Sequence, residues 1–133
     1  SKMKKLILLL HICLLPMCVS CQTEQAFKSV DVAEFEKVIA DTSYVFLDVR
    51  TATEYAEGHI PGTHFNIDVL QESFESEALR VLRKKKKVAL YCRSGNRSKN
   101  AARILSEKGL QVVELSTGFK GWKAVGKPTK VTP

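Results

Sequence analysis

The sequence predicts an α/β domain with a mainly parallel central sheet of about five strands and helices on both faces. Apolar runs of strand length alternate with segments of helical spacing along residues 27–127. The strand candidates are almost continuously apolar, as expected where helices cover both faces of a sheet. In such sheets ligands bind at the carboxyl ends of the strands.

The expected elements follow one another through short connections. A capping-box-like pair, Asp31 and Glu34, indicates the start of the first helix. A strand at 44–49 comes next, and Thr51 with Glu54 indicates a second helix cap. The remaining predictions, in chain order, are a turn at 58–62, a strand at 65–67, a helix at 70–82, a strand at 88–91, a helix around 101–105, a strand at 112–115 and a short helix at 118–122.

The first 21 residues have the organisation of an export signal. Ser1 and Lys2 precede an apparent start at Met3 and are expected to be extraneous to it. A lysine pair, an apolar run and the ending Cys-Val-Ser-Cys follow. This ending resembles the lipobox of bacterial lipoproteins, which implies cleavage before Cys21 and lipid attachment to it. A lipid-anchored protein of the bacterial cell envelope is therefore expected, with ordinary secretory cleavage as the alternative.

Four parts are expected along the chain: the leader at 1–21, a tether at 22–26, the domain at 27–127 and a tail at 128–133. The formal charge is +7, and it falls to +4 without residues 1–20, which hold three lysines and no acid. The basic run 83–87 precedes a strand without interleaved aromatic residues, which is typical of a solvated turn. We therefore expect no nucleic-acid partner. The protein is expected to be a monomer. The three histidines show no metal-ligand spacing, so no metal or cofactor is expected.

Cys92 would be the single free thiol once the leader is removed and Cys21 is acylated. A free thiol in an oxidising compartment is a liability unless it is buried or used. A seven-residue segment joins its strand to the following helix: Cys92-Arg93-Ser94-Gly95-Asn96-Arg97-Ser98. Glycine, inward-pointing N–H groups, a helix N-terminus and two arginines would all favour the thiolate. This makes Cys92 a candidate nucleophile, with a buried structural cysteine as the alternative.

This segment is similar to the active-site loop of the rhodanese family. Three further segments match that family's upstream signature: Asp48-Val49-Arg50, Glu54-Tyr55 and Gly58-His59-Ile60-Pro61-Gly62. Gly118-Phe119 and Gly121-Trp122 resemble its C-terminal signature, so that the resemblance spans 27–127. It implies a sulfurtransferase that takes sulfane sulfur from a small anionic donor such as thiosulfate. The sulfur would pass through a persulfide on Cys92 to cyanide or a thiol.

The resemblance also implies roles for single residues. The backbone of 93–98 would cradle the persulfide, and Arg97 would orient the anionic donor or brace the loop. Apart from the resemblance, the chemistry of Asp48 and Arg50 predicts that they pair and fix the strand end beside the loop. His59 is expected to anchor the turn or to lie at the rim of the site, with a role as general base as the alternative.

Two alternatives stay open. A phosphatase of the Cdc25 type, or an arsenate reductase, has its arginine six residues after the cysteine, whereas Arg97 follows Cys92 by five. The shorter loop suits one sulfur atom better than a tetrahedral anion. A non-catalytic persulfide carrier would need the same loop as an enzyme.

Overall fold

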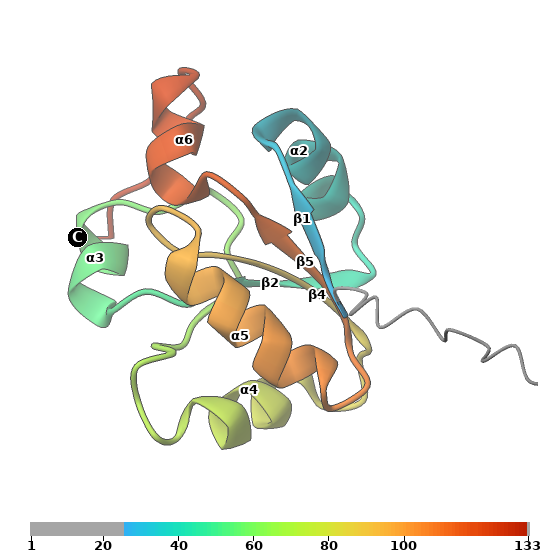
Figure 1. Ribbon diagram of the computed structural model, residues 1–133. Coiled ribbons are helices and arrows are strands. Elements are labelled where there is room, and N and C mark those ends of the chain that lie inside the picture. Colours follow the sequence, from blue (N-terminus) through green and yellow to red (C-terminus); the bar gives the residue numbers. More distant parts are fainter. Residues whose placement is uncertain (1–25, 133) are drawn as a thin grey trace, which may run out of the picture.

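The computed structural model describes residues 26–132, so the leader expected at 1–21 lies outside it. The elements are β1 (Lys28–Val30), α2 (Val32–Ala40), β2 (Tyr44–Asp48), α3 (Ala52–Glu57), β3 (Phe65–Asn66), α4 (Phe74–Leu82), β4 (Lys87–Tyr91), α5 (Asn96–Ser106), β5 (Gln111–Leu115) and α6 (Gly118–Ala124). The five strands form one parallel sheet in the order β1-β5-β4-β2-β3. Helices α2 and α6 cover one face, and α4 and α5 cover the other (Figure 1). The predicted fold class is confirmed.

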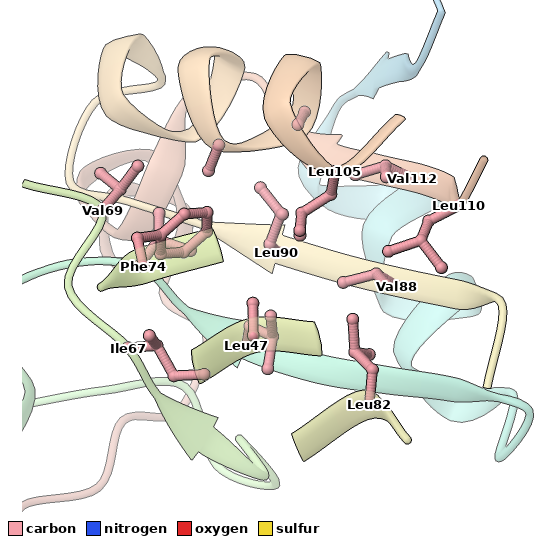
Figure 2. Packing of buried hydrophobic residues seen from close by; sticks show 14 of the residues in the cluster. Leu47, Ile67, Val69, Phe74, Leu82, Val88, Leu90, Leu105, Leu110 and Val112 are labelled. Atoms are coloured by element: carbon pink, nitrogen blue, oxygen red, sulfur yellow. The ribbon is translucent and has the colours of Figure 1, made fainter. Parts of the chain in front are cut away.

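Alternation along the strands gives the sheet an apolar layer on each face. Leu47, Leu90 and Val112 point toward α4 and α5, where they pack with Phe74 and Leu105 (Figure 2). The opposite layer packs against α2 and α6, and its members from the strands are Phe46, Ala89, Tyr91, Val113 and Leu115. Because both faces are buried, the strands are almost continuously apolar, and this is the pattern that made them visible in the sequence.

One strand was not predicted, and two helices begin several residues away from their predicted starts, whereas the other elements agree to within two residues. The strand β1 was not expected, because it has only three residues, of which Lys28 and Ser29 are exposed. The helix expected from residue 70 begins at Phe74, since the Asp68 carboxylate accepts a hydrogen bond from the Leu70 N–H and holds a turn there. The helix expected around 101–105 begins much earlier, at Asn96, immediately after the candidate loop glycine.

The carboxyl ends of the central strands meet at one edge of the sheet. Asp48 at the end of β2 is in register with Tyr91 at the end of β4, and Cys92 follows Tyr91 directly. The Tyr91 hydroxyl accepts a hydrogen bond from the Ile60 N–H at 3.1 Å, which ties the turn at 58–62 to this edge. Burial raises the pKa of this phenol well above its usual value, so the hydroxyl stays protonated at any working pH. The turn at 58–62 and the loop that begins at Cys92 therefore lie at the same edge of the sheet.

No helix of residues 26–132 is both long enough and apolar enough to cross a bilayer.

Candidate active site

The loop after β4 folds tightly around the Cys92 sulfur. Gly95, the residue before α5, has φ +104° and directs its N–H at Cys92 Sγ over 3.1 Å. A side chain at this position would bring its Cβ to 2.2 Å from the Ser116 carbonyl oxygen. Only glycine combines this backbone conformation with this close approach. The N–H is a donor suited to a negatively charged sulfur.

Helix α6 fixes the other side of the loop. The Phe119 and Lys120 N–H groups donate to the carbonyl oxygens of Cys92 and Arg93 at 2.8 and 2.9 Å. Gly118 has φ +62°, and a Cβ there would lie 2.4 Å from the Arg93 carbonyl group. The loop is therefore held between Ser116, which follows β5, and α6, and Cys92 is only 1% exposed.

The predicted loop divides into two parts in the structure. Arg93, Ser94 and Gly95 form the turn, with the first two side chains exposed. Asn96, Arg97 and Ser98 form the first turn of α5. The positive end of this helix therefore lies immediately beside the sulfur, as the strand-loop-helix placement predicted.

Arg97 points to α3 and forms a two-point ion pair with Glu54. The Nη1–Oε1 and Nη2–Oε2 distances are 2.7 and 2.8 Å. The Arg97 hydrogen bonds lower the pKa of the Glu54 carboxyl to about 2. Glu54 also completes the capping box of α3 with Thr51, so one carboxylate joins the helix start to the loop. This contact braces the loop, whereas a role of Arg97 in orienting a donor stays a prediction.

Asp48 and Arg50 form a buried ion pair at the edge of the sheet. The Arg50 Nη2 atom lies 2.6 Å from Asp48 Oδ2 and donates to the Gly58 carbonyl oxygen at 2.7 Å. Burial opposes the charge of the guanidinium, but the Asp48 carboxylate outweighs it and raises the pKa of Arg50. The pair joins the end of β2 to the turn at 58–62 and positions the Arg50 guanidinium 4.5 Å from the centre of the Phe119 ring.

His59 is buried and engaged in the turn. Its Nδ1 lies 2.9 Å from the Tyr55 carbonyl oxygen, which can only accept, so Nδ1 carries the proton. Its ring stacks on Tyr55 at 3.9 Å, and its backbone pairs with Lys130. These contacts anchor the turn, and the structure gives His59 no bond to the loop.

A polar cleft of about 570 Å³ lies next to the loop. Its lining is mostly charged: Arg50, Glu54, Glu57, Gly58, Arg93, Phe119, Lys120 and Lys123. Four of these side chains are cationic and two are acidic, so the cleft favours small anions. Arg93 is the loop residue that borders it. No group of three or more histidine, cysteine, aspartate or glutamate side chains within 26–132 is arranged to hold a metal ion.

Glu114 is a polar residue behind the loop that the sequence did not indicate as part of the site. Cys92 Sγ lies 3.4 Å from Ser98 Oγ, and Ser98 in turn donates to the Glu114 carboxylate at 2.7 Å. Glu114 belongs to β5 and is fully buried. The signal in the sequence was a single acid inside the apolar run 112–115, but nothing local indicated which residues it would meet.

Comparisons with known proteins agree with this geometry. A family model described as the rhodanese-like domain matches residues 31–125. The protein YtwF of Bacillus subtilis is 36% identical over 94 residues, covering 70% of this chain and 86% of its own length. A sulfurtransferase of Allochromatium vinosum is 35% identical over 103 residues, with coverages of 74% and 91%. The crystal structure of a rhodanese-related protein from Thermoplasma volcanium superposes with a TM-score of 0.66 at 33% identity, covering 78% of this chain and 98% of that one.

Proposed function

The chain belongs to the rhodanese-like domain family, and from this premise we propose that it is a sulfurtransferase that carries sulfane sulfur as a persulfide on Cys92. The observation that carries the proposal is the Gly95 N–H directed at Cys92 Sγ over 3.1 Å, at the carboxyl end of a buried strand. A preorganised backbone donor at the reacting sulfur stabilises negative charge there. The proposed donor is a small anion such as thiosulfate, and the proposed acceptor is cyanide or a thiol.

The reaction consists of two displacements. The Cys92 sulfur attacks the outer sulfur of thiosulfate, and the old S–S bond breaks as sulfite leaves with its electron pair. The acceptor then attacks the outer sulfur of the persulfide, and the electron pair of that S–S bond returns to Cys92. Because the enzyme holds the sulfur between the two steps, ping-pong kinetics are expected.

The loop supports sulfur as cargo over phosphate or arsenate. Four residues separate Cys92 from Arg97, and the Arg97 guanidinium is already bound to Glu54 through both terminal nitrogens. A phosphatase-type mechanism needs that guanidinium for the tetrahedral anion. The cationic lining of the neighbouring cleft, with Arg93 and Lys120, would attract an anionic donor toward the loop.

The proposal is tested with Cys92→Ala. Thiosulfate should add the mass of one sulfur atom to the wild-type protein, and cyanide should remove it with release of thiocyanate. Cys92→Ala should show neither event, whereas Lys84→Ala, an exposed change in the basic run, should show both. Equal thiocyanate formation by wild type and Cys92→Ala would refute the assignment of the nucleophile. A stable adduct without turnover would indicate a persulfide carrier instead.

The location of the protein is a separate proposal. We infer export to the bacterial cell envelope and lipid attachment at Cys21 from the lysines, apolar run and lipobox-like ending of the leader. Cys21→Ala should then release the protein from the membrane fraction of expressing bacteria, and Cys13→Ala should not. Retention of both variants, or of neither, would contradict attachment at Cys21.

A further inference from the structure

Glu114 is a buried carboxylate in an apolar layer. It lies between Val113 and Leu115 in β5, and its exposed fraction is 0%. Alternation along the strand turns its side chain to the face that α5 covers, where the neighbouring strand position is filled by Leu90. Burial of a charged group is unfavourable unless hydrogen bonds and an opposite charge compensate for it. Packing alone therefore does not explain why a glutamate occupies this position.

Its partners come from both neighbouring elements. Oε1 accepts hydrogen bonds from Ser98 Oγ at 2.7 Å and from Lys99 Nζ at 3.2 Å, both in α5. Oε2 accepts a hydrogen bond from the hydroxyl of Ser29 in β1. Lys99 also donates to the Gly95 carbonyl oxygen at 3.2 Å, so it joins the carboxylate to the active-site loop.

The hydrogen bonds between Cys92 and Glu114 run in one direction. A hydroxyl has one hydrogen, and Ser98 gives its hydrogen to Glu114. Ser98 Oγ therefore faces Cys92 Sγ, 3.4 Å away, as an acceptor that can receive the thiol hydrogen. The order is Cys92 S–H to Ser98 O–H to the Glu114 carboxylate.

This order favours one negative charge over two. If the thiol and Glu114 were both ionised, the single Ser98 hydrogen could be donated to only one of them, the sulfur would keep only the Gly95 N–H or the carboxylate only Lys99 and Ser29, and the two anions would repel each other. Three cationic side chains lie beside this path: Lys99 binds Glu114, the Arg97 guanidinium is paired with Glu54, and the exposed Arg93 borders the cleft. Two acids joined by one hydroxyl in this way can share a single proton.

We propose that Glu114 is a positioning residue for Cys92 and shares one proton with its thiol through the Ser98 hydroxyl. The inference rests on the proposed function in that Cys92 is the nucleophile. As Sγ bonds to the outer sulfur of the donor, its proton passes to Ser98 Oγ and the Ser98 proton passes to Glu114 Oε1, while sulfite leaves with the electron pair of the broken S–S bond. When the acceptor removes the sulfur, the electron pair returns to Sγ and the proton returns along the same path. Glu114 is thus neutral while Cys92 is loaded.

The first test uses the unloaded protein and needs no sulfur transfer. The rate of Cys92 alkylation by iodoacetamide is measured against pH in wild type and Glu114→Gln. Loss of the coupled charge should move the midpoint of this profile down by about one to two pH units, giving about ten- to hundredfold faster alkylation below it. Glu107→Gln removes an exposed glutamate at the end of α5 and should leave the profile unchanged.

Ser98→Ala keeps the Lys99 and Ser29 contacts of Glu114 and breaks the path alone. Its alkylation midpoint should move in the same direction as that of Glu114→Gln, by a smaller amount. The solvent deuterium isotope effect on persulfide formation from thiosulfate should be present in wild type and lost in Ser98→Ala. This variant tests the proposal even if Glu114→Gln does not fold, which urea unfolding monitored by circular dichroism would reveal.

An alkylation profile that is unchanged in Ser98→Ala and in folded Glu114→Gln, or that moves to higher pH, overturns the shared proton. An isotope effect that persists without the Ser98 hydroxyl overturns the path. A shifted alkylation profile together with no thiosulfate adduct on Cys92 would instead refute the proposed sulfurtransferase and leave the coupling of Glu114 standing.

Discussion

Glu54→Gln tests the contact that joins α3 to the loop at 92–98. The amide can still accept the hydrogen bond from the Thr51 N–H, since glutamine also completes a capping box, so the variant removes chiefly the charge opposite Arg97. The pKa of Glu54 falls from 4.5 to about 2 in the folded protein, chiefly because of the Arg97 hydrogen bonds. For a fully buried pair this shift would equal roughly 3 kcal/mol of folding stability. The two side chains are 25% and 27% exposed, and screening by water reduces the expected loss at pH 7 to about 1–2 kcal/mol.

The pH dependence of this loss has a definite sign. Because folding lowers the pKa of Glu54, its contribution is complete above pH 4.5 and disappears as the pH falls through about 2. Urea unfolding should therefore show a difference between wild type and Glu54→Gln at pH 7 that has fallen by half or more at pH 3. Glu77→Gln breaks an exposed pair with Arg80 and should cost no more than about 0.5 kcal/mol. Equal free energies of unfolding at pH 7, or a difference that is the same at both pH values, would refute the reasoning.

Two further predictions concern the supports of the loop. Asp48→Asn leaves the buried Arg50 guanidinium without its counter-charge. The free energy of unfolding measured in urea should fall by about 3 kcal/mol or more. A loss below about 1 kcal/mol would contradict a stabilising buried ion pair. Gly118→Ala should slow persulfide formation and destabilise the fold, because its Cβ would lie 2.4 Å from the Arg93 carbonyl group. Gly109→Ala is the matched control, since φ there is also positive, at +83°, but nothing lies within 4 Å of the added Cβ. Gly109→Ala should lower the free energy of unfolding only by the backbone strain of about 1–2 kcal/mol and should leave persulfide formation unchanged. Equal effects of Gly118→Ala and Gly109→Ala would show that the contact of Gly118 with the loop is unimportant.

Much of the fold could be predicted because its signals are local. The strands at 44–49, 88–91 and 112–115 are short apolar runs with helices on both faces, and burial on two sides leaves that pattern in any sequence. The Thr51 and Glu54 cap was also visible, since a capping box joins residues three positions apart. Strand β1 left no such pattern, because its two exposed residues and one partly buried residue acquire their conformation only by pairing with β5.

In the candidate site, too, local features could be predicted and long-range contacts could not. The tight turn from Cys92 to Gly95 could be predicted, because its hydrogen bond from the Gly95 N–H to the sulfur spans only three residues. The partner of Arg97 could not, since Glu54 is 43 positions away and also satisfies a local helix cap. The helix cap alone would account for a glutamate at position 54, so nothing in the sequence indicated its second role as the partner of Arg97.

The sequence by itself determined the parallel α/β architecture and the tight turn of the loop after Cys92, since both depend on preferences and hydrogen bonds between near neighbours in the chain. Only the tertiary structure decided what surrounds the sulfur. The strand order brings β5 between β1 and β4, and this placement puts the Glu114 carboxylate behind Ser98 and within its hydrogen-bond distance. Strand order is set by how the apolar faces of sheet and helices pack as a whole, and a single acid in an apolar strand carries no information about which neighbour it will meet.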